Sequence, residues 1–299
     1  IKRIIREYHD MQVQIKATIW FMICSFLQKG ISMITTPIFT RLLDTDEYGR
    51  FGVWNSWYGI IAIFVSFQLT AGVHTQGLIK FGDERKIFTS SLQGLTSVSV
   101  LFWMCIYLMF SAFWNSLLSL NTIQMISMIA MVWTTSIFGF WANEQRVEYN
   151  YKLLVAITIG VSIAKPVLGI LLVKICEDKV TARIVGLLLV EFVFYFWMFI
   201  VQARNGKVFF SKKYWIYALR FNIPLIPHYL SQTVLNSADR IMIGKMVGDN
   251  EAGIYSLAYS LSLLMTMINV ALSQTINPWI YQKIKDKKEL EIAPVAYLT

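Results

Sequence analysis

Lys29 lies near the middle of an apolar segment, residues 17–39, that is long enough to cross a bilayer. At a helical rise of about 1.5 Å per residue, its ammonium group would be roughly 15 Å from either interface, too far for snorkelling. A charge at that depth is costly and marks ion or substrate paths in membrane proteins. Ser25, Ser32 and Thr36 share its helical face, because the spacings are 4, 3 and 4 residues. We therefore expect Lys29, Ser25 and Ser32 to line a polar path.

Three further apolar segments carry polar residues at helical spacing, so each would present one polar face. Such a face can also serve packing, because Ser, Thr and Gly are common between membrane helices. Four stripes in one chain nevertheless favour a central hydrophilic cavity. The three additional stripes are Thr158, Ser162, Lys165 and Gly169; His228, Gln232, Asn236 and Asp239; and Ser262, Thr266, Asn269 and Ser273. The candidate substrate contacts among them are Lys165, His228, Gln232, Asn236 and Asn269.

Lys165 has a possible partner in Glu191, which lies in the next apolar segment. The two segments would form a hairpin, and both residues are at a similar distance from its open end. A structural ion pair and a role in the cavity are equally compatible with this spacing. If Glu191 faced the cavity instead, it would be a candidate proton-coupling carboxylate.

The composition predicts the elements that must hold these residues. Hydrophobic residues make up 56% of the 299 and charged residues 15%, whereas a soluble domain carries about 25% charged residues. The apolar segments are of helical length and lack the ten-residue alternation of an outer-membrane barrel. We predict an all-α polytopic membrane protein with about eight transmembrane helices. These are residues 17–39, 51–73, 88–110, 123–143, 153–173, 182–202, 221–243 and 252–277.

A polar loop follows the first span and recurs 204 residues later. Residues 41–51 read RLLDTDEYGRF and residues 245–255 read KMVGDNEAGIY. At this constant offset, three pairs of residues stand out, and they are Arg41 and Lys245, Glu47 and Glu251, and Gly49 and Gly253. A loop used twice without slippage predicts a duplicated membrane unit, and secondary transporters are commonly built from such repeats.

The repeat suggests how the chain is divided. We expect a first six-helix lobe over residues 1–203, a basic cytoplasmic linker over 204–220, and the first two helices of an incomplete second lobe over 221–299. With the N-terminus in the cytoplasm, 18 basic residues fall on the cytoplasmic side and seven on the other. The positive-inside rule therefore predicts a cytoplasmic N-terminus.

Several function classes find no support in the sequence. Its three cysteines and three histidines are scattered, without the spacing of a metal site, and we expect no metal or cofactor. No Walker loop, dinucleotide-binding glycine motif or nucleophile motif is present, so we do not expect an enzyme. The net charge of +9 comes from short loops between apolar spans and does not indicate nucleic-acid binding.

Two stretches resemble a known family. KGISMITTPIFTRLLDTDEYGRFGVW, residues 29–54, is similar to the first helix and loop of Wzx-type polysaccharide or O-antigen flippases. NSADRIMIGKMVGDNEAGIYSLAYSLS, residues 236–262, resembles the start of their second lobe. These proteins belong to the multidrug/oligosaccharidyl-lipid/polysaccharide exporter superfamily, and the resemblance extends over about residues 15–285.

The resemblance implies two six-helix bundles around a central cavity, with alternating access as in other multidrug and toxic compound exporters. It implies an oligosaccharide on undecaprenyl pyrophosphate as substrate, moved across the bacterial plasma membrane for O-antigen or other surface polysaccharide synthesis. Membrane lipids, a polysaccharide polymerase and a chain-length regulator are the implied partners. The family supplies no universal catalytic residues, so the candidate residues above rest on the stripes. The alternatives are a multidrug or cation exporter, a membrane-embedded polymerase, and a pathway scaffold.

Overall fold

The computed structural model describes residues 13–262 and 265, and in this part of the chain every regular element is a helix. Residues 1–253 form one compact unit and residues 254–299 a second. The described residues of the second unit are helical. The all-α polytopic fold expected from the composition is therefore confirmed.

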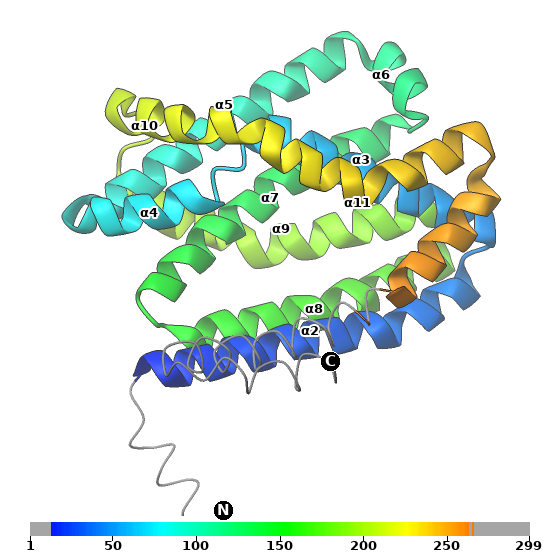
Figure 1. Ribbon diagram of the computed structural model, residues 1–299, viewed down its shortest axis with the longest axis horizontal. Helices are drawn as coiled ribbons and strands as arrows, with labels where there is room; N and C mark the ends of the chain where they lie inside the picture. The colour runs from blue at the N-terminus through cyan, green and yellow to red at the C-terminus, as the bar shows by residue number, and fades with distance from the viewer. Residues whose placement is uncertain (1–12, 263–264, 266–299) are drawn as a thin grey trace, which may run out of the picture. The chain divides into compact units, whose positions relative to one another are not determined.

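Figure 1 labels ten α-helices in the described residues of the first unit. They are α2 (Val13–Leu42), α3 (Thr45–Ser66), α4 (Gly72–Lys80), α5 (Arg85–Met109), α6 (Ser111–Leu118), α7 (Thr122–Val147), α8 (Tyr151–Ile175), α9 (Lys179–Gly206), α10 (Lys212–Asn222) and α11 (Ile226–Met246). Two 3₁₀ turns, η1 (Gly82–Glu84) and η2 (Ile223–Leu225), precede α5 and α11. The expected linker at 204–220 thus contains most of α10, while the division into lobes stays a prediction.

Among the described residues, five helices are long and apolar enough to cross a membrane. They match the first, third, fourth, fifth and sixth of the predicted spans. The predicted second span, 51–73, was wrong in its end, because the helix stops at Ser66 and resumes as α4. The predicted seventh span, 221–243, falls on η2 and α11, and neither α3 nor α11 reaches the hydropathy of the other five. The predicted eighth span extends beyond the described residues.

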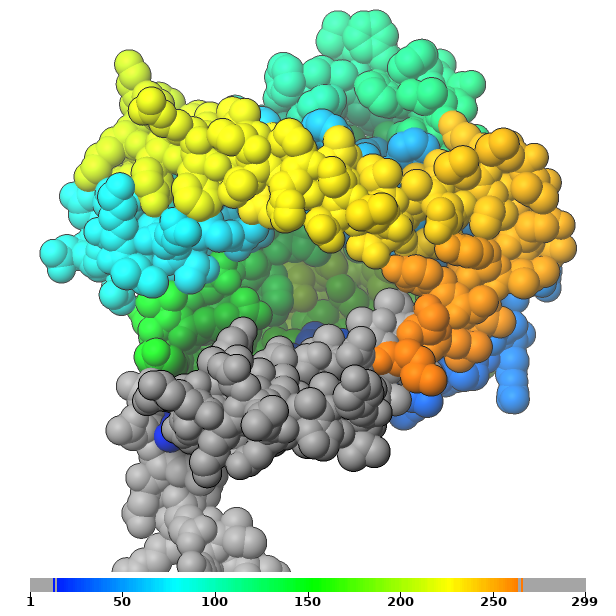
Figure 2. Space-filling view, in the orientation of Figure 1, coloured from blue at the N-terminus to red at the C-terminus, as the bar shows by residue number. Residues whose placement is uncertain are grey.

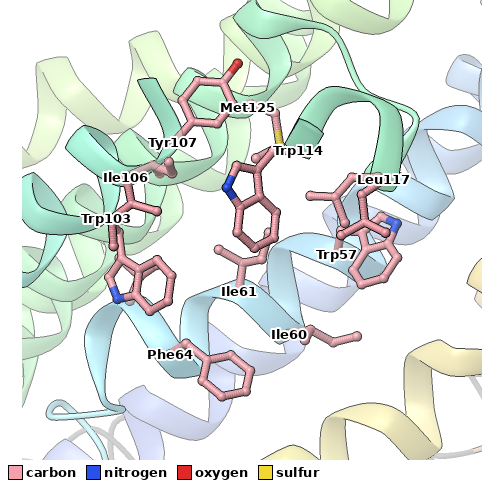
Figure 3. A pocket seen from close by; sticks show the side chains of 13 residues that line it. Trp57, Ile60, Ile61, Phe64, Trp103, Ile106, Tyr107, Trp114, Leu117 and Met125 are labelled. Carbon is pink, nitrogen blue, oxygen red and sulfur yellow. The ribbon is translucent and has the colours of Figure 1, made fainter. Parts of the chain in front are cut away.

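Helix α9 is the hub of the first unit. It packs against α8, α7, α5 and α3, while α2 packs on α8 and α11 packs on α3. One core cluster joins α3, α5, α6, α7 and α9 around buried residues such as Trp54, Met128 and Ile184. Beside it, side chains from α3, α5, α6 and α7 surround an apolar pocket (Figure 3).

The interruption between α3 and α4 is held by one side chain from α10. Phe67 and Gln68 both have positive φ, 49° and 51°, which ends α3 and is unfavourable for residues with a side chain. Fully buried Asn222 donates from Nδ2 to the carbonyl oxygen of Phe67 at 2.8 Å and to that of Gln68 at 2.7 Å. Asn222 is the last residue of α10. Its side chain therefore links the end of α10 to the break between α3 and α4.

Replacing Asn222 should therefore weaken the fold. We expect Asn222→Ala to destabilise the protein by about 1–3 kcal/mol for each buried carbonyl left unpaired. Asn222→Asp should be no better, because an ionised carboxylate cannot donate a hydrogen bond. Thermal unfolding in detergent micelles measures both, with exposed Asn205→Ala as the matched control. An unchanged melting temperature for Asn222→Ala would contradict this account.

Candidate substrate path and repeat contact

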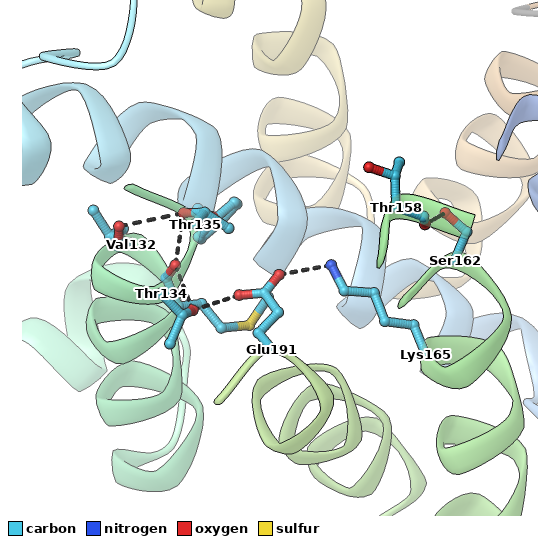
Figure 4. Close-up of polar contacts among 9 residues, drawn as sticks. Val132, Thr134, Thr135, Thr158, Ser162, Lys165 and Glu191 are labelled. Atoms are coloured by element: carbon cyan, nitrogen blue, oxygen red, sulfur yellow. Dashed lines mark hydrogen bonds and ion pairs between the residues drawn. The ribbon is translucent and has the colours of Figure 1, made fainter. Parts of the chain in front are cut away.

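Lys165 and Glu191 form an ion pair in the middle of the helix bundle. The Lys165 Nζ atom on α8 is 2.6 Å from Glu191 Oε1 on α9. Thr134 on α7 donates from Oγ1 to Glu191 Oε2 at 2.5 Å, so both carboxylate oxygens accept a hydrogen bond (Figure 4). The Glu191 side chain is 1% exposed and that of Lys165 is 28% exposed. Glu191 is therefore enclosed by protein, whereas the Lys165 side chain is partly exposed at the protein surface.

A second hydrogen-bonded pair lies beside this carboxylate. The hydroxyl groups of Tyr58 on α3 and Thr135 on α7 are 3.0 Å apart, and Thr135 also donates to the Met131 carbonyl oxygen at 2.7 Å. Thr134, Thr135 and Tyr58 were not among the residues predicted from the sequence. Adjacent threonines in the middle of an apolar span were the signal that could have identified them.

Lys29 has no carboxylate partner within 4 Å in the part of the chain that the structure describes. Its side chain is exposed, as are those of Ser25 and Ser32. The Ser25 hydroxyl donates to the Phe21 carbonyl oxygen at 2.9 Å, within its own helix. Ser25, Lys29 and Ser32 therefore do not take part in helix packing. Buried residues such as Cys24, on a neighbouring face of α2, do.

Helix α11 presents the second exposed polar stripe. His228, Gln232 and Asn236 are all exposed, and Asn236 Nδ2 donates to the Gln232 carbonyl oxygen at 2.8 Å. Figure 2 shows the surface hollowed beneath α11 (yellow), with green helices at the back of the hollow. Asn269, the remaining candidate, lies outside the described residues.

The two copies of the repeated loop lie against each other. A Cβ atom at Gly49 would overlap the carbonyl oxygen of Asp249, and one at Gly253 would overlap that of Thr45. The offset of 204 residues relates Thr45 to Asp249 and Gly49 to Gly253, so the two contacts are reciprocal. Such reciprocity is what a local twofold axis produces, because each copy presents the same patch to the other. We call these four residues the repeat contact.

The acidic residues of the two loops have equivalent places at a helix start. Glu47 Oε2 accepts from the backbone N–H of Asp44 at 2.9 Å, an arrangement that caps α3, and is 3.1 Å from Lys179 Nζ. Glu251 Oε2 lies beside Gly248, which takes the place of Asp44 at the offset. Gly248 has φ of 151°, a value that L side chains rarely adopt.

The basic residues of the motif lie at helix ends. Arg41 and Lys245 occupy the last turns of α2 and α11, where a cation interacts favourably with the helix dipole. Arg50 Nε is 4.0 Å from the half-buried Asp249 carboxylate. Burial raises the pKa of that carboxyl group, and the Arg50 guanidinium opposes the change. The repeated motif thus builds helix ends and a close backbone contact.

The ion pair between Lys165 and Glu191 should be energetically coupled. Removing one partner leaves a charge in a low-dielectric site, which costs about 3–5 kcal/mol for buried pairs. We expect Lys165→Met and Glu191→Gln each to lower the melting temperature, and the double variant to lose less than the sum. The matched control is the exposed pair Lys213 and Glu84, 2.8 Å apart, which should show little coupling. Additive losses at Lys165 and Glu191 would show that the pair is not coupled.

The repeat contact makes a separate prediction. Gly49→Ala and Gly253→Ala should each destabilise the protein by about 1–3 kcal/mol, because the new methyl group meets backbone atoms that cannot rotate away. Gly160→Ala is the control, since its Cβ would be 3.6 Å from the nearest Phe194 atom, an ordinary contact. Thermal unfolding of the three variants compares them. Equal stability of all three would disprove the close contact.

Comparison with known proteins identifies a relative and a family. A protein of the Lsg locus of Haemophilus influenzae is 22% identical over 297 residues, covering 91% of this chain and 67% of its own. No solved structure matches the chain. Residues 15–283 match the polysaccharide biosynthesis protein family, and this range covers most of the 299-residue chain. With its polytopic helical fold, this chain belongs to the polysaccharide biosynthesis protein family.

Proposed function

We propose that this chain takes part in moving an oligosaccharide linked to undecaprenyl pyrophosphate across the bacterial plasma membrane. The product would serve O-antigen or other surface polysaccharide synthesis, in cooperation with a polymerase and a chain-length regulator. Membership in the polysaccharide biosynthesis protein family supports a role in this pathway. The N-terminus would be cytoplasmic, in keeping with the distribution of basic residues.

The observation that carries the proposal is the environment of Lys29. It lies in the middle of an apolar helix, is exposed, and has no carboxylate partner among the described residues. Holding a cation at the depth of the membrane hydrocarbon without a counter-ion is costly, and an anionic ligand would offset that cost. A pyrophosphate group or an acidic sugar passing along α2 supplies such an anion.

Transport would use alternating access rather than covalent chemistry. The exposed stripes on α2 and α11 supply hydroxyl and amide groups, which suit the hydroxyl groups of a glycan. The repeat contact holds the two loop copies together at one end of the first unit. Separation of the two copies at this contact would open that end, as in the rocking of one repeat against another.

The alternative of a multidrug or cation exporter has less support. Such a protein needs an acidic group exposed along its path, whereas Glu191 is enclosed and paired with Lys165. A membrane-embedded polymerase is likewise less favoured, since the connections between described helices are short. Neither alternative explains a cation on α2 that has no carboxylate partner among the described residues.

Complementation tests the proposal. A bacterial strain without its own flippase for the same glycan would receive the full-length protein, and surface polysaccharide would be measured. We expect restoration by wild type and Lys29→Arg, and at least a tenfold loss with Lys29→Ala, because about 1.4 kcal/mol of lost binding already gives tenfold. Lys174→Ala, an exposed lysine on α8, is the matched control.

The outcomes separate the parts of the proposal. Full activity of Lys29→Ala at equal expression would remove Lys29 from the path. Failure of the wild-type protein with every glycan tested would contradict transport of lipid-linked oligosaccharides.

A further inference from the structure

An apolar pocket of about 350 Å³ lies between α3, α5, α6 and α7. Figure 3 shows Trp57, Trp103 and Trp114 around it, with Ile61 rising from its floor and Tyr107 at its edge. Tryptophan is enriched where membrane proteins meet the lipid headgroups. The pocket therefore has the lining of a site for a hydrocarbon chain beside the polar boundary of the membrane. We call it the tryptophan groove.

A cation lies at one end of the tryptophan groove. The Lys245 Nζ atom is 5.6 Å from the centre of the Trp57 ring and donates to the carbonyl oxygen of Leu117, and both residues line the groove. Lys245 has no carboxylate within 4 Å in the described ranges, and an ammonium group has three N–H donors. At least one donor is thus left for a ligand.

Lys245 also borders a second, polar pocket of about 670 Å³. Two carboxylates line that pocket, and both are occupied. Asp249 lies 4.0 Å from Arg50, and Asp178 accepts hydrogen bonds from Thr181 at 3.0 and 2.6 Å. Lys245 is therefore the cation at the boundary between an apolar pocket and a polar one.

A second donor beside Lys245 lacks an acceptor. The indole N–H of Trp57 is buried and has no hydrogen-bond partner in the described structure. In Figure 3 the Trp57 nitrogen lies on the side of the ring nearest Leu117, whose carbonyl receives the Lys245 ammonium. A cation and an unsatisfied donor at the head of an apolar groove match an anionic group attached to a hydrocarbon chain.

We propose that the tryptophan groove binds one acyl chain of an anionic membrane phospholipid, with the phosphate of that lipid at Lys245. The volume of the groove is at the lower end of the 300–1,000 Å³ of small-ligand sites, which suits one acyl chain rather than a long polyprenyl chain. The bilayer supplies such lipids in excess. This site is separate from the Lys29 stripe and does not depend on the proposed transport activity.

Lipid retention by the purified full-length protein tests the site. Native mass spectrometry would compare phosphatidylglycerol with phosphatidylcholine of the same chains, and glycerol phosphate would compete as a headgroup without chains. We expect about a fivefold preference for phosphatidylglycerol, the effect of one basic residue near an anionic lipid. Lys245→Gln should abolish the preference, and Lys174→Gln, at the same end of the bundle as Lys245, should keep it. Glycerol phosphate should not displace the lipid.

A second variant tests the chain site. Ile61→Phe adds volume inside the groove and should lower retention of both phospholipids at least twofold, while gel filtration confirms that the variant is folded. Equal retention of the two lipids by wild type, or unchanged retention by folded Ile61→Phe, would overturn the proposal. Displacement by glycerol phosphate, or tighter retention of polyprenyl phosphate than of phosphatidylglycerol, would also overturn it. None of these outcomes bears on complementation by Lys29 variants.

Discussion

The arrangement of the first unit depends on a contact that leaves no room for side chains. Gly49 and Gly253 each face a carbonyl oxygen of the opposite loop copy, and any larger residue would push the copies apart. This close approach holds α11 along α3, and α3 in turn packs on α7 and α9. It also brings Lys245, at the end of α11, within reach of α6. The tryptophan groove therefore has its cation because of two glycines elsewhere.

Lys165 and Lys29, each near the middle of an apolar helix, illustrate how surroundings decide the role of a charge. Lys165 has a carboxylate at 2.6 Å, and that carboxylate is further bound by Thr134, so the charges compensate each other. Lys29 has no such partner among the described residues and lies on an exposed face. The same residue type at similar depth thus stabilises helix packing in one case and leaves an attractive site for an anion in the other.

The features that could be predicted from the sequence are those set by period and length. Five of the eight predicted spans are helices long and apolar enough to cross a membrane in the part of the chain that the structure describes, and the constant offset of 204 residues predicted that Gly49 and Gly253 are equivalent. An ion pair between Lys165 and Glu191 was one of two interpretations that the sequence left open, because a hairpin keeps residues at equal depth side by side, and the structure shows that pair.

The features that could not be predicted depend on contacts between distant segments. Phe67 and Gln68 adopt positive φ without any glycine to signal a break, because Asn222 from α10 holds their carbonyl oxygens. No local sequence pattern predicts a hydrogen bond between residues more than 150 positions apart. The tryptophan groove was missed for the same reason, since its lining comes from four helices and each tryptophan alone looks like ordinary membrane-protein composition.

The repeat contact has a consequence for the ancestry of the chain. Both loop copies meet at one end of the unit. If the two lobes are repeats, an even number of membrane crossings would separate the copies, and the axis relating them would run along the membrane normal. A precursor with a single copy could then have paired with an identical chain inserted in the same orientation. Inverted repeats, in contrast, require a precursor that inserted in both orientations. Here, gene fusion would have joined two neighbours that already shared a direction in the membrane.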